Sequence, residues 1–146
     1  MTMKIYRITE YSADIAEAFA KLLPQLSASA QTPTTEQICS LLQNPNTLLL
    51  VAENEGAIIG MLSLVIVDIP TGRKAWIEDV VVDEVARGLG VGQALVEEAK
   101  VLATSLGARK IYLTSNPSRK AAHALYSKCG FEVYNTTLFR LLLEEK

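Results

Sequence analysis

The sequence predicts a mixed α/β fold in one domain spanning residues 1–146, and three observations support this. The chain has 146 residues, and domains cluster around 100–150 residues. Apolar residues gather in short β-type runs, and between these runs they recur at helical spacing. The order of these patterns is a strand, two helices, a meander of strands, and then alternating strands and helices. That order is typical of a mixed α/β domain.

Helix starts are marked by capping residues. Ser12 precedes the apolar stripe of a first helix, and Thr34 with Gln37 forms a capping box for a second, shorter one. Two more helices are expected, one from Val91 that ends at Gly107 and one over Ser118–Lys128. The stripe of the first helix is Ile15, Phe19, Leu22, Leu23 and Leu26.

The strand predictions rest on β-type runs bounded by turn residues. Asn54-Glu55-Gly56 is a hairpin turn between two of these runs, and Pro70-Thr71-Gly72 is a second turn. We expect strands over Lys4–Ile8, Thr47–Glu53, Ala57–Val67, Lys74–Val82, Lys110–Thr114, Phe131–Val133 and Leu138–Leu143.

Composition narrows the function classes. The net charge of −2 argues against a general nucleic-acid binder, and no apolar run reaches the roughly 18 residues of a membrane span. Two cysteines and one histidine give no metal-ligand spacing and no disulfide framework. The start of the chain lacks the apolar stretch of a signal peptide, so we expect a cytoplasmic protein without a metal.

Charge is unevenly distributed along the chain. Residues 1–86 hold eleven acids and five bases, whereas the stretch between Glu98 and Glu132 holds six bases and no acid. The basic stretch is either a solvated face or a surface that holds a small polyanion. The acidic first half favours a cationic ligand.

A glycine-rich run, Arg87 to Gly92, follows a strand and precedes a helix. Such a turn binds anions, because the first N–H groups of a helix lack partners and glycines let a phosphate approach the backbone. It is no Walker A loop, since Gln93 stands where that loop has its second glycine. A dinucleotide fingerprint fails as well, because its last glycine would fall on Gln93 or Leu95.

The remaining pattern, Arg87-x-x-Gly90-x-Gly92, resembles the acyl-CoA loop of the GNAT superfamily of N-acetyltransferases. The strand Trp76–Val82 precedes it, and Asn116–Ala122 and Ala124–Phe131 follow, in that family's order and at its spacing. The resemblance implies a sheet of about six or seven strands, mostly antiparallel with a splayed central parallel pair, flanked by about four helices. It also implies acetyl-CoA as co-substrate.

The resemblance assigns the cofactor contacts residue by residue. The strand backbone would hold the pantetheine arm, the loop amides would hold the pyrophosphate with Arg87 as counter-charge, and Asn116 would bond the pantetheine or orient the substrate. Asn116 followed by proline is also a common turn. The implied cofactor-binding residues are Val80, Val81, Val82, Arg87, Gly88, Leu89, Gly90, Val91, Gly92, Gln93, Asn116 and Tyr126.

The resemblance also implies two catalytic residues. Tyr126 matches the family's usual proton donor to the coenzyme A thiolate, although its helical spacing alone would make it a core aromatic. Glu78 is the leading candidate for the base, because a carboxylate inside an apolar strand is costly unless used. Alternatively, Glu78 pairs with a nearby base or caps a turn. Trp76 either packs in the core or lines the substrate cleft.

These features predict an enzyme that moves an acetyl group from acetyl-CoA to a primary amine of a small molecule or protein by direct attack in a ternary complex. The alternative is a regulatory module that binds acyl-CoA without turnover. The apolar segment Thr137–Leu143 is expected to be an inner strand or part of a homodimer interface.

Overall fold

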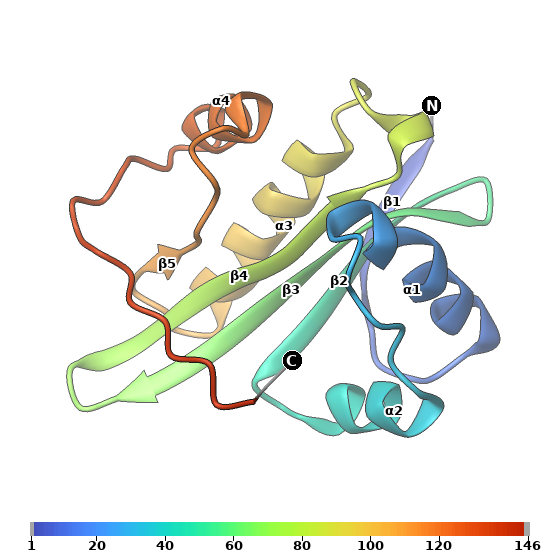
Figure 1. Ribbon diagram of the computed structural model, residues 1–146, viewed down its shortest axis with the longest axis horizontal. Coiled ribbons are helices and arrows are strands. Elements are labelled where there is room, and N and C mark those ends of the chain that lie inside the picture. The colour runs from blue at the N-terminus through green and yellow to red at the C-terminus, as the bar shows by residue number, and fades with distance from the viewer. Residues whose placement is uncertain (1, 145–146) are drawn as a thin grey trace.

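The computed structural model describes residues 2–144 and shows one mixed sheet with helices on both faces (Figure 1). Residues 1 and 145–146 of the predicted domain lie outside the described part. The strands are β1 (Met3–Ile8), β2 (Thr47–Asn54), β3 (Ala57–Ile69), β4 (Gly72–Val82) and β5 (Ile111–Tyr112). The helices are α1 (Ala13–Leu26), α2 (Thr35–Gln43), the 3-10 turn η1 (Glu84–Ala86), α3 (Val91–Ser105) and α4 (Lys120–Lys128).

The sheet has the strand order β1-β2-β3-β4-β5. The first four strands pair antiparallel with their neighbours, and β5 pairs parallel with β4. The hairpin predicted around Asn54–Gly56 is confirmed, since Glu55 and Gly56 both have positive φ between β2 and β3. The mixed α/β class is confirmed as well.

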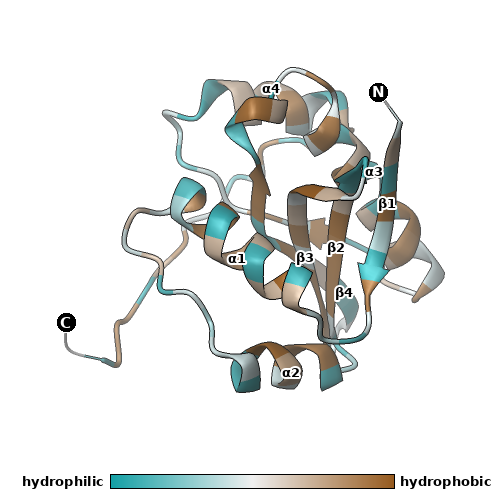
Figure 2. Cartoon of the chain, turned by 90° about the vertical axis from the view of Figure 1, so that its right-hand side faces the viewer, coloured by the Kyte–Doolittle hydropathy of each residue, from teal (hydrophilic) through white to brown (hydrophobic). Residues whose placement is uncertain are grey.

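Two apolar clusters hold the layers together. Alternate residues of β2, β3 and β4, such as Leu50, Leu64 and Ile77, pack against α3. The residues between them, such as Leu49 and Met61, pack against α1 and α2. This explains why β2 and β3 read as nearly continuous apolar runs, and Figure 2 shows these strands hydrophobic along most of their length.

The helix caps form as the sequence predicts. The Ser12 hydroxyl accepts from the Ile15 N–H at 3.2 Å, and Thr34 and Gln37 form the reciprocal capping box. The buried stripe of α1 is Ile15, Ala18, Phe19 and Leu22, which places Leu23 and Leu26 at its edge. No helix in residues 2–144 is long and apolar enough to cross a membrane.

One feature of β4 was not expected. Ser63 pairs with Glu78 while Met61 pairs with Val81, so β4 carries one residue more than β3 across this interval. Asp79 adopts a positive φ of 50° at this bulge, a conformation that aspartate tolerates better than most residues. The bulge interrupts the regular alternation of side chains along β4 after Glu78.

The C-terminal strand predictions are wrong. Residues 131–143 form no helix or strand, so the five strands of the described residues fall short of the expected six or seven. The parallel pair therefore lies at the sheet edge instead of its centre. A strand needs a paired neighbour for its backbone, and β5 offers an edge of only two residues. The apolar side chains stay exposed, with Val133 at 94% and Phe139 at 89%.

Candidate active site

The site begins at the open side of β4. The ladder between β4 and β5 holds only two pairs, Ala75 with Ile111 and Trp76 with Tyr112. Among residues 2–144, no strand pairs with β4 beyond Trp76 on that side. Backbone N–H and C=O groups near Val80–Val82 are therefore free to bond an extended ligand, as an added strand would.

The side chains of Val80, Val81 and Val82 pack this end of β4 against both faces of the sheet's core. Val81 is buried against the α1 side of the sheet. Val80 and Val82 are half-buried on the α3 side and pack against the same cluster as Leu125 and Tyr126 of α4. The end of β4, the start of α3 and the helix α4 therefore meet in one place.

The glycine-rich turn lies directly after this strand. Gly88 and Gly90 have φ of 82° and 81°, a region in which a side chain is strained. A Cβ on either glycine would meet no atom within 4 Å, so the need for glycine is conformational and the space beside the loop is open. Leu89 at the tip of the turn is 54% exposed, whereas Val91 is buried and anchors the helix start.

The first turn of α3 has the properties of an anion site. Gly90 is the N-cap residue and makes no side-chain cap bond, so no side chain competes for the N–H groups near Val91, Gly92 and Gln93. The helix dipole adds partial positive charge at this end. Uncapped amides, open space and the exposed Arg87 side chain together fit the diphosphate of coenzyme A.

Close helix packing holds this turn against α4. A Cβ on Gly92 would lie 3.1 Å from Leu125 Cδ2, and one on Gly60 of β3 would lie 2.9 Å from Val91 Cγ1. Both glycines therefore permit close approach, Gly60 between β3 and α3 and Gly92 between α3 and α4. The Gly60 contact joins β3 to α3, which are far apart in sequence, so it leaves no local sequence signal.

Side chains of α1 form polar contacts with the residues between β4 and the glycine-rich turn. Asp83 is 1% exposed, its Oδ2 lies 2.9 Å from Lys21 Nζ, and its Oδ1 accepts from Val85 N–H at 3.3 Å. Gln25 donates to Asp83 and accepts from the Glu84 N–H at 2.9 Å. The hydrogen bond between Lys21 and the Asp83 carboxylate is the main reason why the pKa of Asp83 lies below its usual value. The sequence patterns do not predict this contact. The position of Asp83, a carboxylate between an apolar strand and the glycine run, is the one local signal for it.

Glu78 lies on β4 immediately before the bulge, and its side chain is exposed to solvent. Partial desolvation, and then the charge of neighbouring Asp79, raise the pKa of its carboxyl. The ion pairs of the described residues do not include Glu78, so the pairing that was its alternative interpretation is not seen there.

Tyr126 lies on α4 with its ring half-buried, and its centroid is 6.0 Å from that of Phe131 in an edge-on arrangement. Burial raises the pKa of the Tyr126 hydroxyl, while the charge of Arg119 opposes that change. The hydroxyl therefore stays protonated near neutral pH.

Asn116 organises the turn into α4. Its Oδ1 accepts from the N–H of Ser118 at 2.9 Å and from the Ser118 hydroxyl at 2.8 Å. Its backbone oxygen lies 3.0 Å from His123 Nε2. These bonds support the interpretation of Asn116-Pro117 as a turn. Because Oδ1 is engaged, the side-chain NH₂ group is the part of Asn116 that can bond a ligand.

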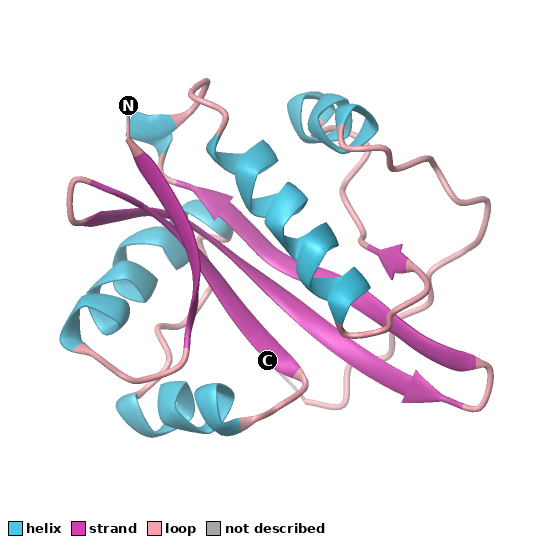
Figure 3. Ribbon diagram, turned by 180° about the vertical axis from the view of Figure 1, so that it is seen from behind, coloured by secondary structure: helices cyan, strands magenta, loops and turns pink. Residues whose placement is uncertain are grey.

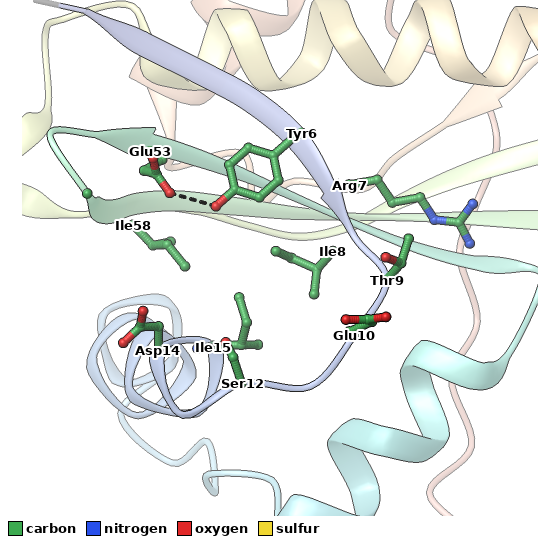
Figure 4. Close-up of a pocket in the computed structure, with 11 residues that line it drawn as sticks. Tyr6, Arg7, Ile8, Thr9, Glu10, Ser12, Asp14, Ile15, Glu53 and Ile58 are labelled. Carbon is green, nitrogen blue, oxygen red and sulfur yellow. Dashed lines mark hydrogen bonds between the residues drawn. The ribbon is translucent and has the colours of Figure 1, made fainter.

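A surface pocket of about 260 Å³ lies elsewhere, at the opposite sheet edge between β1 and α1 (Figure 4). Tyr6 and Glu53 line it, and the Tyr6 hydroxyl donates to the Glu53 carboxylate at 2.7 Å. That hydrogen bond chiefly raises the pKa of Tyr6 to about 12. None of the residues predicted to contact acyl-CoA lines this pocket.

An open strand edge followed by a glycine-rich anion site at a helix start defines the architecture of an acyl-CoA-dependent acyltransferase. The chain matches the model of the acetyltransferase (GNAT) family over residues 13–131, and it belongs to that family. It is accordingly an N-acetyltransferase that uses acetyl-CoA as co-substrate and acetylates an amine.

The comparisons also identify individual relatives. The chain is 34% identical to glucosamine 6-phosphate N-acetyltransferase 1 of Oryza sativa subsp. japonica, with 91% of this chain and 85% of that protein covered. The crystal structure of glucosamine-6-phosphate N-acetyltransferase from Arabidopsis thaliana superposes with a TM-score of 0.81 at 26% identity, covering 97% and 99% of the two chains. An aminoglycoside acetyltransferase from an uncultured soil metagenomic sample shares the fold, with a TM-score of 0.84 at 20% identity and 96% of each chain covered.

Proposed function

We propose that this protein transfers the acetyl group of acetyl-CoA directly to the primary amine of a small molecule within a ternary complex. The observation that carries this proposal is the juxtaposition of the open β4 edge with the uncapped start of α3. The strand offers backbone to a pantetheine arm, and the turn offers amides to a diphosphate. Both are elements of one extended ligand.

The cofactor side of the site is assigned as follows. Backbone groups of Val80, Val81 and Val82 hold the pantetheine arm. The amides of the turn and the Arg87 guanidinium hold the diphosphate, the latter by charge-assisted hydrogen bonds. The turn residues involved are Arg87, Gly88, Leu89, Gly90, Val91, Gly92 and Gln93. Asn116 bonds the pantetheine through its amide NH₂, since its Oδ1 is engaged by Ser118.

The chemistry requires proton removal from the amine nitrogen and proton donation to the thiolate sulfur. An alkyl ammonium with a pKa near 10 must lose a proton before its nitrogen attacks the thioester carbonyl. Glu78 accepts that proton through water, and its raised pKa brings the carboxylate closer to the basicity this needs. The new C–N bond forms, the C–S bond breaks, and Tyr126 gives its proton to the departing thiolate. The attacking nitrogen loses its second proton as it becomes the amide, and that proton restores the Tyr126 hydroxyl. A backbone N–H near Val80 or Val81 stabilises the oxyanion.

Amino sugars are the acceptor class that the relatives favour. Glucosamine 6-phosphate is named for the rice and Arabidopsis thaliana proteins, at 34% and 26% identity. The aminoglycoside acetyltransferase shares the fold alone, so it carries less weight for the acceptor.

The test is thiol release from acetyl-CoA across a panel of amines: glucosamine 6-phosphate, glucosamine, a polyamine, a lysine peptide and an aminoglycoside. We expect release above the hydrolytic background with at least one amine, and an N-acetylated product by mass spectrometry. Saturable acetyl-CoA binding without release for any amine would instead support the regulatory module.

A further inference from the structure

Three side chains form a cluster on the strands that flank the open edge. The rings of Trp76 and Tyr112 stack with centroids 5.2 Å apart and a tilt of 35°. Lys74 Nζ lies 5.9 Å from the Trp76 centroid and 5.4 Å from that of Tyr112. We call Lys74, Trp76 and Tyr112 the aromatic–lysine cluster.

The cluster lies on the sheet face that carries Glu78. Ala75 and Ile77 are buried against α3, and strand side chains alternate, so Lys74, Trp76 and Glu78 lie on the opposite face. The bulge does not disturb this order, because it begins only after Glu78. Trp76 and Glu78 are two residues apart, which corresponds to roughly 7 Å along a strand.

Ligands can reach the cluster. All three side chains are half-buried. The C-terminal segment passes the same face, in front of the sheet in Figure 1 and behind it in Figure 3. Its Tyr134 ring lies 5.8 Å from that of Tyr112, yet Tyr134 is itself 66% exposed. Within the described residues, no carboxylate forms an ion pair with Lys74.

The chemistry of the cluster fits one kind of acceptor. Flat aromatic faces pack against the apolar C–H face of a sugar ring, and an ammonium group binds a phosphate. Lys74 and Glu78 stand two residues before and two residues after Trp76 on the same face of β4, so an ammonium and a carboxylate lie on either side of the aromatic residue along the strand. A hexosamine phosphate carries an amine and an anion at the two ends of a single ring. A polycation would instead place positive charge against Lys74.

We infer that the aromatic–lysine cluster binds the acceptor and selects a phosphorylated amino sugar, with Lys74 on the phosphate, Trp76 and Tyr112 along the sugar, and the amine directed to Glu78. This inference rests on the proposed function. It assigns acceptor recognition to side chains of β4 and β5, separate from the backbone contacts to acetyl-CoA.

The experiment compares kcat/KM for glucosamine 6-phosphate and for glucosamine at saturating acetyl-CoA. The two amines differ only in the phosphate, so their ratio reports its recognition. We expect the wild-type protein to favour the phosphorylated amine, and Lys74→Met to reduce kcat/KM for that amine about 10- to 100-fold, as loss of a charged hydrogen bond does. The value for glucosamine should change less than about threefold, and Lys74→Arg should recover most of the loss.

The control is Lys4→Met, which removes the same charge from exposed β1 at the far sheet edge and should leave the ratio unchanged. Equal wild-type kcat/KM for the two sugars, or an equal loss for both in Lys74→Met, would overturn the inference. Turnover of a polyamine or aminoglycoside but of neither sugar would also overturn it while leaving the acetyltransferase proposal intact. No turnover of any amine would remove the proposed function itself.

Discussion

The two sides of the site are built from different material. The proposed cofactor side consists of backbone: the unpaired edge of β4, the glycines at positive φ and the amides that begin α3. The proposed acceptor side consists of side chains from two strands, namely Lys74, Trp76 and Glu78 on β4 and Tyr112 on β5. Every sequence with this fold has the same backbone groups, whereas side chains differ from one sequence to the next. We therefore expect family members to share acetyl-CoA binding and to differ in the amine that they accept.

The largest expected effect separates the two sides through Glu78. Glu78→Gln keeps the size of the side chain but cannot accept a proton, so we expect kcat to fall by about 10²- to 10⁴-fold. The KM for acetyl-CoA should not change, because Glu78 belongs to the acceptor side. Steady-state kinetics with acetyl-CoA and the amine varied in turn measures both. A kcat within threefold of wild type would remove Glu78 from the mechanism.

The pH profile sharpens this assignment. Desolvation and the charge of Asp79 raise the pKa of Glu78, and a base is active only when deprotonated. The rate should therefore fall as pH drops through a value above the ordinary carboxyl pKa. Asp79→Asn removes one of these two causes, so the acidic limb should move to lower pH while the base remains. An unmoved limb would show that another group titrates there.

Tyr126→Phe should have the next largest effect, a loss of about 100-fold in kcat. Phenylalanine keeps the ring that packs against Phe131 but has no proton for the departing thiolate. Because burial raises the pKa of Tyr126, the wild-type rate should show no loss from its deprotonation near neutral pH. Unchanged thermal stability together with reduced kcat would support the chemical role, whereas reduced stability alone would indicate packing.

Gly90→Ala tests the cofactor side alone. An alanine at φ of 81° costs about 1–2 kcal/mol, so the turn should distort and the KM for acetyl-CoA should rise about tenfold while the KM for the amine stays constant. Gly56→Ala is the matched control, because Gly56 has φ of 80° and an equally open environment in the β2–β3 turn. Its substitution should lower stability without altering either KM. Equal KM changes in both variants would contradict the assignment.

Gly60→Ala should affect activity least, because Gly60 packs β3 against α3 and contacts neither proposed ligand. The added methyl would lie 2.9 Å from Val91 Cγ1 and 3.2 Å from Leu95 Cδ1, so we expect a loss of about 1–3 kcal/mol in the free energy of unfolding. Chemical denaturation measures this. An unchanged midpoint would mean that α3 can shift away from β3 without cost.

The local structure of the proposed cofactor side follows from the sequence more directly than the arrangement of the proposed acceptor side, and the reason is physical. Glycines at positive φ and a strand followed by a helix are local properties, so the sequence places the turn at Arg87–Gly92 correctly between β4 and α3. The stacking of Trp76 on Tyr112 depends on the pairing of β4 with β5, strands more than 30 residues apart. The sequence left Trp76 between the core and the cleft for this reason.

Two other differences have equally specific causes. The bulge at Asp79 depends on the register with β3, which local propensity does not encode. The segment Leu138–Leu143 has the composition of a strand, but a strand forms only against a partner edge, and β5 provides two residues. The homodimer predicted from the same apolar segment remains a prediction that sedimentation analysis can address.

The central claim is that the turn at Arg87–Gly92 binds the diphosphate of coenzyme A, and calorimetric titration of coenzyme A tests it most directly. The account predicts saturable binding to the wild-type protein and at least tenfold weaker binding to Arg87→Glu, which places a negative charge beside the diphosphate. An absence of binding to the wild-type protein, or equal affinity in the two proteins, would contradict it.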